Sequence, residues 1–459
     1  MDKVRFAKVT FWSTAAGLIM SQVLTMACAA STTKLIAATQ GPSGVANYSQ
    51  IRQLCQMFAM VMTFNGGATV VRDLGARPEA SRLPYLVAIA VCVCAMFVLC
   101  SVAVSVAPAE LQYTLTGLRR PWQSLLLCSV VAMVIGLCTL SQSALNGLSL
   151  RREMFTSQTL GGVSQLAAAI VSSFYGSFSY TLLLLAQSLF GFGVAANFLF
   201  LSFRKSNAIR DFLKHPFFDF EAFRQFTTLS GAALLTGLLS NAAIFSCRTL
   251  YLKTGGGQFG GTFDAAFTIS QTYVIFLTGS LSAHFLPRYA AAFSRAGESM
   301  LDEFSEEVNN CLRVSILASA LLISVMMAML NLSISLLYSR EFLGAREILQ
   351  WMLVGDFFKL TGWSFGLAVI ARADTKKLIL IETVWQIVLV SMSYSLIGKV
   401  GLETFGIAYV AASVCHWLCV FVLCTRNYGV VIKRQHVATW CAAFACVVLS
   451  AWFATRIGR

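Results

Sequence analysis

The chain has 459 residues, of which 57% are hydrophobic and 12% are charged, and its mean hydropathy is +0.72. A soluble globular protein carries about 25% charged residues, so this composition excludes a soluble domain and indicates an integral membrane protein. The formal charge of +14 is spread over short loops, which argues against a nucleic-acid patch and favours a role in topology and attraction to anionic lipids.

Apolar runs long enough to cross a hydrocarbon core about 30 Å thick recur along the chain, and in lipid they must be helices. The first run resembles a signal peptide that ends at Ala27–Ala30, but it is too long for one, so we expect it to be retained. The runs predict an all-α, polytopic fold with thirteen spans, at 9–38, 46–71, 84–107, 123–147, 156–176, 178–202, 225–251, 258–286, 309–338, 344–370, 378–398, 402–425 and 437–455.

The longest connection divides the first twelve of these spans into two groups of six. We therefore expect a six-helix lobe at 1–202, an amphipathic linker on the inner membrane surface at 203–224, a second lobe at 225–425, and an extra helix within 426–459. Gly41–Gln53 and Gly260–Thr272 follow similar glycine-rich turns in the two halves, which is typical of transporters built from repeats.

Lysine and arginine are concentrated in alternate loops, including Arg72, Arg204, Lys205, Arg372 and Lys377. This positive-inside bias places the N-terminus in the cytoplasm. Arg456 and Arg459, which then lie outside, depart slightly from the rule.

The sequence offers no enzyme or metal motif. It has no glycine-rich phosphate loop ending in Lys-Ser or Lys-Thr, no HExxH and no GxSxG. The 14 cysteines are scattered along apolar spans, Cys92 and Cys94 lack the spacing of a zinc or redox pair, and the four histidines are far apart in sequence. We expect a protein that is not an enzyme and that needs no metal or cofactor.

Eight charged residues remain in or beside the predicted spans. Long stems can carry some of the cations to the interface, and the acids near span ends can be solvated groups. The alternative is a polar cavity, because a charge at mid-depth costs roughly 2.5–3.5 kcal/mol on insertion scales. The residues are Lys34, Arg52, Arg248, Arg313 and Lys359 among the cations, and Asp264, Asp356 and Glu382 among the anions.

Asp356 and Lys359 are the hardest of these to explain by position alone. They lie three residues apart near the middle of the 344–370 span, so they share a helix face and can pair. The pair can be purely structural, or Lys359 can bind an anionic substrate while Asp356 orients it or takes up a proton. Thr63–Val71, TFNGGATVV, adds small residues that suit either close helix packing or a flexible gate.

Three segments resemble the bacterial lipid-linked oligosaccharide flippases, and most closely the O-antigen and enterobacterial common antigen translocases of the multidrug/oligosaccharidyl-lipid/polysaccharide exporter superfamily. They are Lys34–Gln56, Thr63–Val71 and above all Leu336–Asp374, and the resemblance extends over about residues 5–425. It implies two six-helix lobes around a central cationic cavity lined by spans one, two, seven and eight. Comparable polar positions in that family coincide with Lys34, Arg52, Arg248, Asp356, Lys359 and Glu382; Arg313 matches a basic position, and Asp264 has no clear counterpart.

The resemblance implies a flippase of the bacterial inner membrane. It would move an undecaprenyl-diphosphate-linked oligosaccharide from the inner to the outer leaflet by alternating access. Lys34, Arg52, Arg248 and Lys359 would bind substrate, and Asp356, Asp264 and Glu382 would couple or pair. A polysaccharide polymerase and a chain-length regulator are expected partners. The alternatives are an ion-coupled multidrug antiporter, which would favour an acid-rich cavity, and a membrane polymerase or glycosyltransferase, which would need a large outside loop or an acidic motif.

Overall fold

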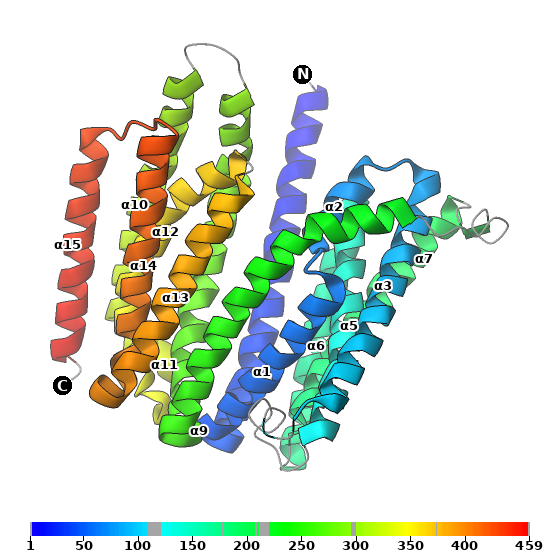
Figure 1. The fold of residues 1–459 in the computed structure, drawn as a ribbon, viewed down its shortest axis with the longest axis horizontal. Helices are drawn as coiled ribbons and strands as arrows, with labels where there is room; N and C mark the ends of the chain where they lie inside the picture. Colours follow the sequence, from blue (N-terminus) through cyan, green and yellow to red (C-terminus); the bar gives the residue numbers. More distant parts are fainter. Residues whose placement is uncertain are drawn as a thin grey trace. The chain divides into compact units, whose positions relative to one another are not determined.

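The computed structural model describes residues 2–108, 110, 121–176, 178–206, 209–210, 220–294, 300–372 and 374–457. Every regular element within these ranges is a helix, which confirms the predicted all-α class (Figure 1). Much of the predicted linker, residues 207–208 and 211–219, lies outside the described residues, as does most of the loop at 108–122.

The helices coincide closely with the predicted spans. The first part of the chain forms α1 (Asp2–Thr63), α2 (Gly67–Ala76), α3 (Glu79–Val106), α5 (Pro121–Gly147), α6 (Arg151–Phe174), α7 (Tyr180–Lys205) and α9 (Phe220–Ser294). The remainder forms α10 (Met300–Ala328), α11 (Leu330–Leu337), η1 (Arg340–Phe342), α12 (Ala345–Ala371), α13 (Thr375–Val400), η2 (Gly401–Glu403), α14 (Thr404–Val422), η3 (Leu423–Asn427) and α15 (Arg434–Ile457).

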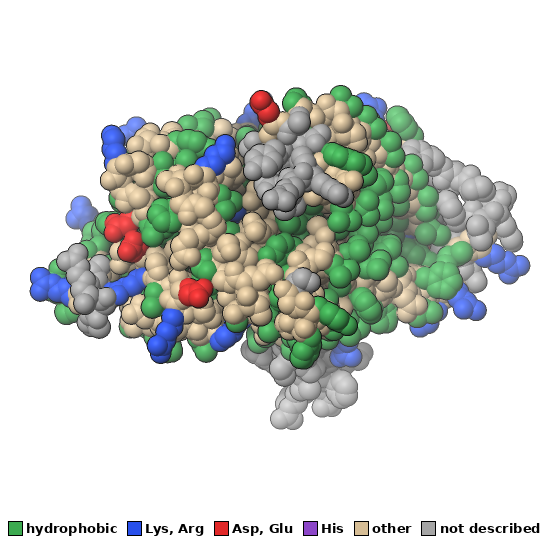
Figure 2. All heavy atoms as spheres, turned by 90° about the horizontal axis from the view of Figure 1, so that it is seen from below, with side chains coloured by type: hydrophobic (Ala, Val, Ile, Leu, Met, Phe, Trp, Pro, Cys, Tyr) green, Lys and Arg blue, Asp and Glu red, His purple; other side chains and the backbone are tan. Residues whose placement is uncertain are grey.

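Eight helices in the described ranges are long and apolar enough to cross a membrane, or nine if α1 and α2 form one bent span. Two of them, at 233–293 and 375–427, are 61 and 53 residues long and interrupted by glycine, so each has the length of two crossings. The predicted span at 156–176 coincides with α6, which is not among the eight. Apolar side chains form continuous areas of the surface (Figure 2).

The two longest helices are broken at glycines with almost the same backbone conformation. Gly41 in α1 has φ 64° and ψ −161°, and Gly256 in α9 has φ 65° and ψ −158°. Only glycine adopts this region readily, because a Cβ atom would clash with the backbone. The breaks fall between predicted spans one and two and between spans seven and eight, and thus support the internal repeat that the sequence indicates.

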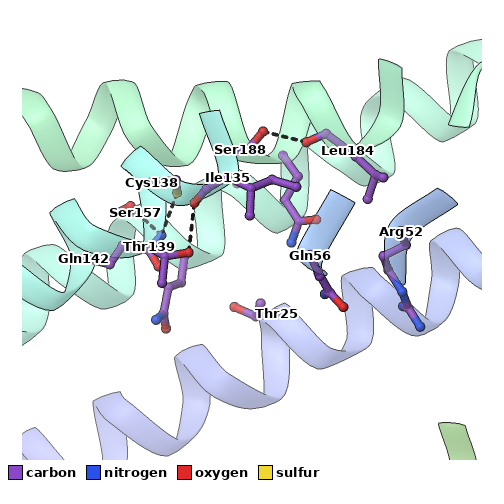
Figure 3. A pocket seen from close by; sticks show the side chains of 13 residues that line it. Thr25, Arg52, Gln56, Ile135, Cys138, Thr139, Gln142, Ser157, Leu184 and Ser188 are labelled. Carbon is purple, nitrogen blue, oxygen red and sulfur yellow. Dashed lines mark hydrogen bonds between the residues drawn. The ribbon is translucent and has the colours of Figure 1, made fainter. Parts of the chain in front are cut away.

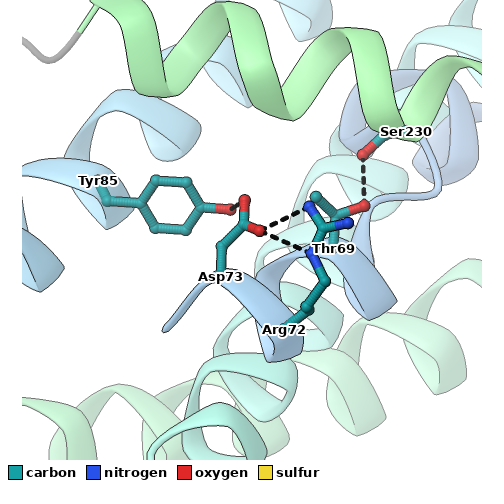
Figure 4. A network of polar contacts seen from close by, with 5 residues as sticks. All are labelled: Thr69, Arg72, Asp73, Tyr85 and Ser230. Carbon is teal, nitrogen blue, oxygen red and sulfur yellow. Dashed lines mark hydrogen bonds and ion pairs between the residues drawn. The ribbon is translucent and has the colours of Figure 1, made fainter. Parts of the chain in front are cut away.

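The chain divides into two compact units. Unit 1 comprises residues 1–40 and 47–241, and unit 2 comprises residues 41–46 and 242–459. The division therefore falls inside α9 rather than at 203–224. The first turns of α9 belong to unit 1 because the Asn65 side chain donates to the Ala233 carbonyl at 2.9 Å, and Ser230 donates to Thr69 at 3.0 Å (Figure 4).

The TFNGGATVV segment is a helix break that packs closely within unit 1. Phe64 and Asn65 have φ of 52° and 51°, and a Cβ atom on Gly66 would lie 2.4 Å from the ring of Phe226. Just beyond it, Asp73 accepts hydrogen bonds from Arg72 at 2.7 Å and from the Tyr85 hydroxyl at 3.0 Å (Figure 4). These contacts fix α2 against α3 and favour the packing interpretation of this segment.

The extra C-terminal helix is present as α15, and it packs against α10 and α12. Its approach is fixed by Asn309 of α10, whose side chain donates to the Val431 carbonyl at 2.8 Å and accepts from the Lys433 amide at 3.0 Å. Trp440 of α15 stacks on Phe444 and lies 5.4 Å from Phe357 of α12, measured between ring centroids.

Replacing Gly261 by alanine is expected to destabilise unit 2 by about 1–3 kcal/mol, since overpacking costs that much in a filled core. The new Cβ atom would lie 2.1 Å from the backbone oxygen of Pro42, so the backbone must shift. Gly279→Ala is the matched control, because Gly279 is also within α9 and has no neighbouring atom within 4 Å of its Cβ position. Thermal unfolding in detergent measures both; equal melting temperatures for the two variants would contradict the close approach.

Candidate functional site

The carboxylate of Asp356 lies in the middle of α12 and is fully buried in unit 2. Three hydroxyl groups donate to it: Ser270 at 2.8 Å and Tyr273 on one oxygen, and Tyr409 at 2.6 Å on the other. Ser270 and Tyr273 are one turn apart on α9, and Tyr409 comes from α14. Hydrogen bonds to a charged group contribute about 1.5–3 kcal/mol each, so this cage stabilises a carboxylate inside the unit.

Lys359 lies one turn after Asp356 and is half-buried. Its ammonium lies 3.4 Å from the Gln271 side-chain oxygen, 5.3 Å from the Trp385 ring and 5.5 Å from the Tyr409 ring. Aromatic faces attract a cation, and a partly desolvated one is held by about 1–2 kcal/mol. Lys359 is thus held by an amide and by π-faces.

The expected direct ion pair between Asp356 and Lys359 is not formed, although both residues are within the described ranges. Three hydroxyl groups already occupy three of the roughly four acceptor positions of the carboxylate. The two charges are connected through neutral groups instead: the Gln271 amide donates to the Tyr409 hydroxyl at 3.4 Å, and that hydroxyl donates to Asp356. Lys359 therefore keeps its charge available to another anion.

Arg248 and Asp264 form a second buried site in unit 2. Nε and Nη2 of Arg248 lie 2.7 and 2.5 Å from Oδ1 of Asp264, and the side chains are 4% and 1% exposed. The two residues flank the break at Gly255 and Gly256, so the ion pair ties the two parts of α9 together. Arg248, which was expected to bind substrate, is enclosed in the unit by this ion pair. Asp264 is paired, which is one of the two roles expected for it, and is not the solvated group that its place near a helix end allowed.

The other charges of unit 2 are more open. The Glu382 carboxylate lies 3.5 Å from Nε2 of His416, and its side chain is 36% exposed. Arg313 of α10 is exposed, as expected for a side chain that reaches the interface. Glu382 thus has a partner that charges only when the imidazole takes up a proton.

Arg52 lies in unit 1, where it lines a partly open polar cavity of about 190 Å³ formed by residues of α1, α5, α6 and α7 (Figure 3). Its guanidinium lies 5.4 Å from the centroid of the Tyr48 ring. Thr25, Gln56, Thr139 and Ser188 also line the cavity. Lys34, further along α1, is exposed.

Sequence reasoning missed the neutral members of both sites. Ser270, Gln271, Tyr273 and Tyr409 carry no charge, and polar residues of this kind are common in spans as packing groups. A detectable signal was present for the cavity in unit 1, because glutamine side chains inside apolar helices need hydrogen-bond partners. Four of them, Gln56, Gln142, Gln158 and Gln187, line that cavity.

The loop between α12 and α13 holds a polar network that lies outside the spans. Asp374 caps α13 by accepting from the Lys377 amide at 3.4 Å, and it pairs with the Lys377 ammonium at 2.9 Å. Tyr428 donates to the same carboxylate at 3.1 Å, and the Arg372 guanidinium lies 4.2 Å from the Tyr428 ring. The hydrogen bond from Lys377, followed by that from Tyr428, holds the pKa of Asp374 below its usual value.

Asp374→Asn is expected to lower the melting temperature at pH 7 and to lower it less at pH 3. The folded pKa of Asp374 is lower than the unfolded one, so the carboxylate stabilises the fold above the unfolded value of about 3.9, and this contribution is lost as the pH falls through the folded pKa. Melting curves of both proteins across pH 3–7 measure the difference. A gap that stays constant over this interval would contradict the assignment.

Within the described ranges, no group of three or more histidine, cysteine or acidic side chains is arranged to hold a metal ion. All 14 cysteines are free thiols, and most are buried among apolar side chains. Buried thiols of this kind act as small packing residues.

No protein-family model matches the chain. It is 26% identical over 428 residues to the lipid III flippase of Escherichia coli K12, which covers 92% of this chain and 99% of that protein. The same values hold for the lipid III flippase of Shigella flexneri.

Two solved structures have the same arrangement of helices. An inward-facing multidrug resistance transporter of the MATE family has a TM-score of 0.70 and 13% identity, covering 90% of this chain and 99% of that one. The lipid II flippase MurJ in an inward closed conformation has a TM-score of 0.65 and 13% identity, covering 96% and 97%. The chain is therefore a multi-pass membrane protein with the fold of the MOP-superfamily transporters.

Proposed function

We propose that this protein is a flippase that moves an undecaprenyl-diphosphate-linked oligosaccharide from the inner to the outer leaflet of a bacterial inner membrane. It would act by alternating access. The oligosaccharide that it delivers would be used to assemble a surface polysaccharide of the O-antigen or common-antigen type. The near full-length similarity to lipid III flippases supports the transport of a lipid-linked substrate.

The proposal rests on a difference between the acids and the cations: the acids named below have partners within the chain, whereas two of the cations have no carboxylate close to them. Three buried or half-buried acids in the described helices are held by the chain itself: Asp356 by three hydroxyl groups, Asp264 by Arg248, and Glu382 beside His416. Among the described residues, neither Arg52 nor Lys359 has a carboxylate within ion-pair distance. Cations left without an internal anion suit a diphosphate.

We assign substrate contact to Arg52 and Lys359, with Lys34 as a further exposed cation on α1. Arg248 is not included, because its charge is neutralised by Asp264. Asp356 is the group we propose for orienting this region of α12 or for taking up a proton. The N-terminus would be cytoplasmic, as the lysine and arginine bias favours, and a polymerase and a chain-length regulator would receive the product.

The second candidate is an ion-coupled multidrug antiporter, which the similarity in fold to MATE transporters favours. A cationic drug would need an acid that is free to receive it. Asp356, Asp264 and Glu382 are already partnered, and this disfavours the antiporter.

The test is transport in proteoliposomes that contain a polyprenyl-diphosphate saccharide with a fluorophore on the sugar. Dithionite, which does not cross membranes, bleaches only the outer leaflet, so a flippase raises the bleached fraction beyond one half. We expect the wild-type protein to do so and heat-inactivated protein not to. Failure to flip this lipid, together with export of a cationic dye by the same vesicles, would favour the antiporter instead.

A further inference from the structure

The cavity in unit 1 is lined by side-chain amides from four helices. Gln56 is on α1, Gln142 is on α5, and Gln158 is on α6, while Gln187 adds a fourth from α7. An amide in a membrane span needs hydrogen-bond partners, because lipid offers none. Four amides around one cavity therefore require an explanation.

One of these amides, that of Gln142, is satisfied by described residues of the chain. Gln142 donates to the Ser157 hydroxyl at 3.1 Å and lies 3.3 Å from the Cys138 sulfur (Figure 3). Gln158 and Gln187 are half-buried and Gln56 is exposed, and within the described residues the structure shows no hydrogen bond made by these three side chains. Their donors and acceptors are directed to whatever fills the cavity, which is water or a polar ligand.

Arg52 gives this polar cavity its charge. Among the described residues that line the cavity there is no acidic side chain, and their formal charge is that of the Arg52 guanidinium. Arginine presents a planar fork of donors that fits a phosphate or a carboxylate. The lining is thus complementary to a ligand with several hydroxyl groups and one negatively charged group.

The size of the cavity limits the ligand further. Its volume of about 190 Å³ is below the roughly 300–1,000 Å³ of pockets that hold drug-sized molecules. A ligand about the size of a single sugar ring therefore suits this cavity. Amide groups donate and accept at once, as sugar hydroxyls do, and pair with them without a mismatch.

We infer that this cavity binds one sugar residue that carries a negative charge. The charge can belong to the phosphate joined to the first sugar or to the carboxylate of an acidic sugar further along. The inference rests on the proposed function and identifies the part of the lipid-linked substrate that unit 1 recognises.

Saturation-transfer-difference NMR on the full chain in lipid nanodiscs tests the inference, since it detects weak binding. The probes are glucose 1-phosphate, glucuronate and neutral glucose, and empty nanodiscs give the background. We expect at least one of the two anions to bind more tightly than glucose. Tighter binding of glucose 1-phosphate assigns the cavity to the diphosphate end, and tighter binding of glucuronate assigns it to an acidic sugar.

Gln158→Leu and Gln187→Leu are expected to weaken binding of the preferred anion about tenfold each, because each removes hydrogen bonds that only the ligand uses. Arg52→Met is expected to reduce the affinity for the anion to that for glucose. Gln435→Leu, at an exposed glutamine of α15, is the matched control and should bind as the wild type does. Melting temperatures show that each variant is folded.

Three results would overturn the inference: no signal above empty nanodiscs, equal affinity for glucose and both anions, or unchanged affinity in folded Gln158→Leu and Gln187→Leu proteins. The proteoliposome assay separates this from failure of the proposed function. If the protein flips the lipid but binds no probe, only the inference of a sugar-binding cavity is refuted. If it binds a probe but does not flip the lipid, only the proposed flippase activity is refuted.

Discussion

Arg248→Met is expected to lower the free energy of unfolding by about 3–5 kcal/mol, the cost of leaving one member of a buried ion pair without its partner. Asp264 is 1% exposed and takes two nitrogens of Arg248 on one oxygen. Methionine fills similar space, so most of the loss comes from the buried carboxylate of Asp264, which loses its ion pair with Arg248. Unfolding in mixed micelles, followed by the fluorescence of the eight tryptophans, measures the change.

The double variant Arg248→Met, Asp264→Leu should be more stable than Arg248→Met alone, because it buries no charge. Arg313→Met is the matched control; Arg313 is exposed, and a change of less than about 0.5 kcal/mol is expected. A single variant as stable as the wild type would show that Asp264 is solvated, which was the alternative favoured by its place near a predicted helix end.

The same ion pair bears on motion within unit 2. Arg248 precedes the break at Gly255 and Gly256, and Asp264 follows it. A glycine pair permits bending there, while the ion pair resists it. Arg248 therefore helps to fix the path of α9, and a loss of activity in its variants would not by itself indicate contact with substrate.

Helix positions were predictable because the hydrocarbon thickness fixes how long an apolar run must be. The span expected at 344–370 is α12, Ala345–Ala371, and the extra helix expected at 437–455 is α15, Arg434–Ile457. The division into units was not predictable, because the contacts of Asn65 with Ala233 and of Thr69 with Ser230 join segments more than 150 residues apart.

The charged members of the site were predictable, and their partners were not. A charge in an apolar run is visible in one sequence, whereas the partners of Asp356 are ordinary polar residues 86, 83 and 53 positions away. The direct pair with Lys359 followed from helix spacing alone, and the hydroxyl groups of α9 and α14 displace it. Spacing shows which residues can meet, and tertiary contacts decide which do.

Those contacts give different expectations for the two possible roles of Asp356 and Lys359, a structural pair of charges or binding of substrate by Lys359. Lys359→Met is expected to leave the protein folded, because methionine packs on Trp385 and Tyr409 as the lysine stem does, and to lower the flipping rate at least tenfold. Asp356→Asn keeps one oxygen acceptor for the surrounding hydroxyl groups, so it should be milder than Asp356→Leu, which leaves three buried hydroxyl groups without their acceptor.

The double variant Asp356→Asn, Lys359→Met decides between structure and substrate binding. If the two charges only balance one another, removing both should restore what either single change loses. If Lys359 holds the diphosphate, the double variant should fold normally and flip as slowly as Lys359→Met. We expect the second result, since the ammonium has only an amide oxygen and two aromatic faces near it. Flipping restored to the wild-type rate in the proteoliposome assay would make the pair structural and leave Arg52 as the cation that binds substrate.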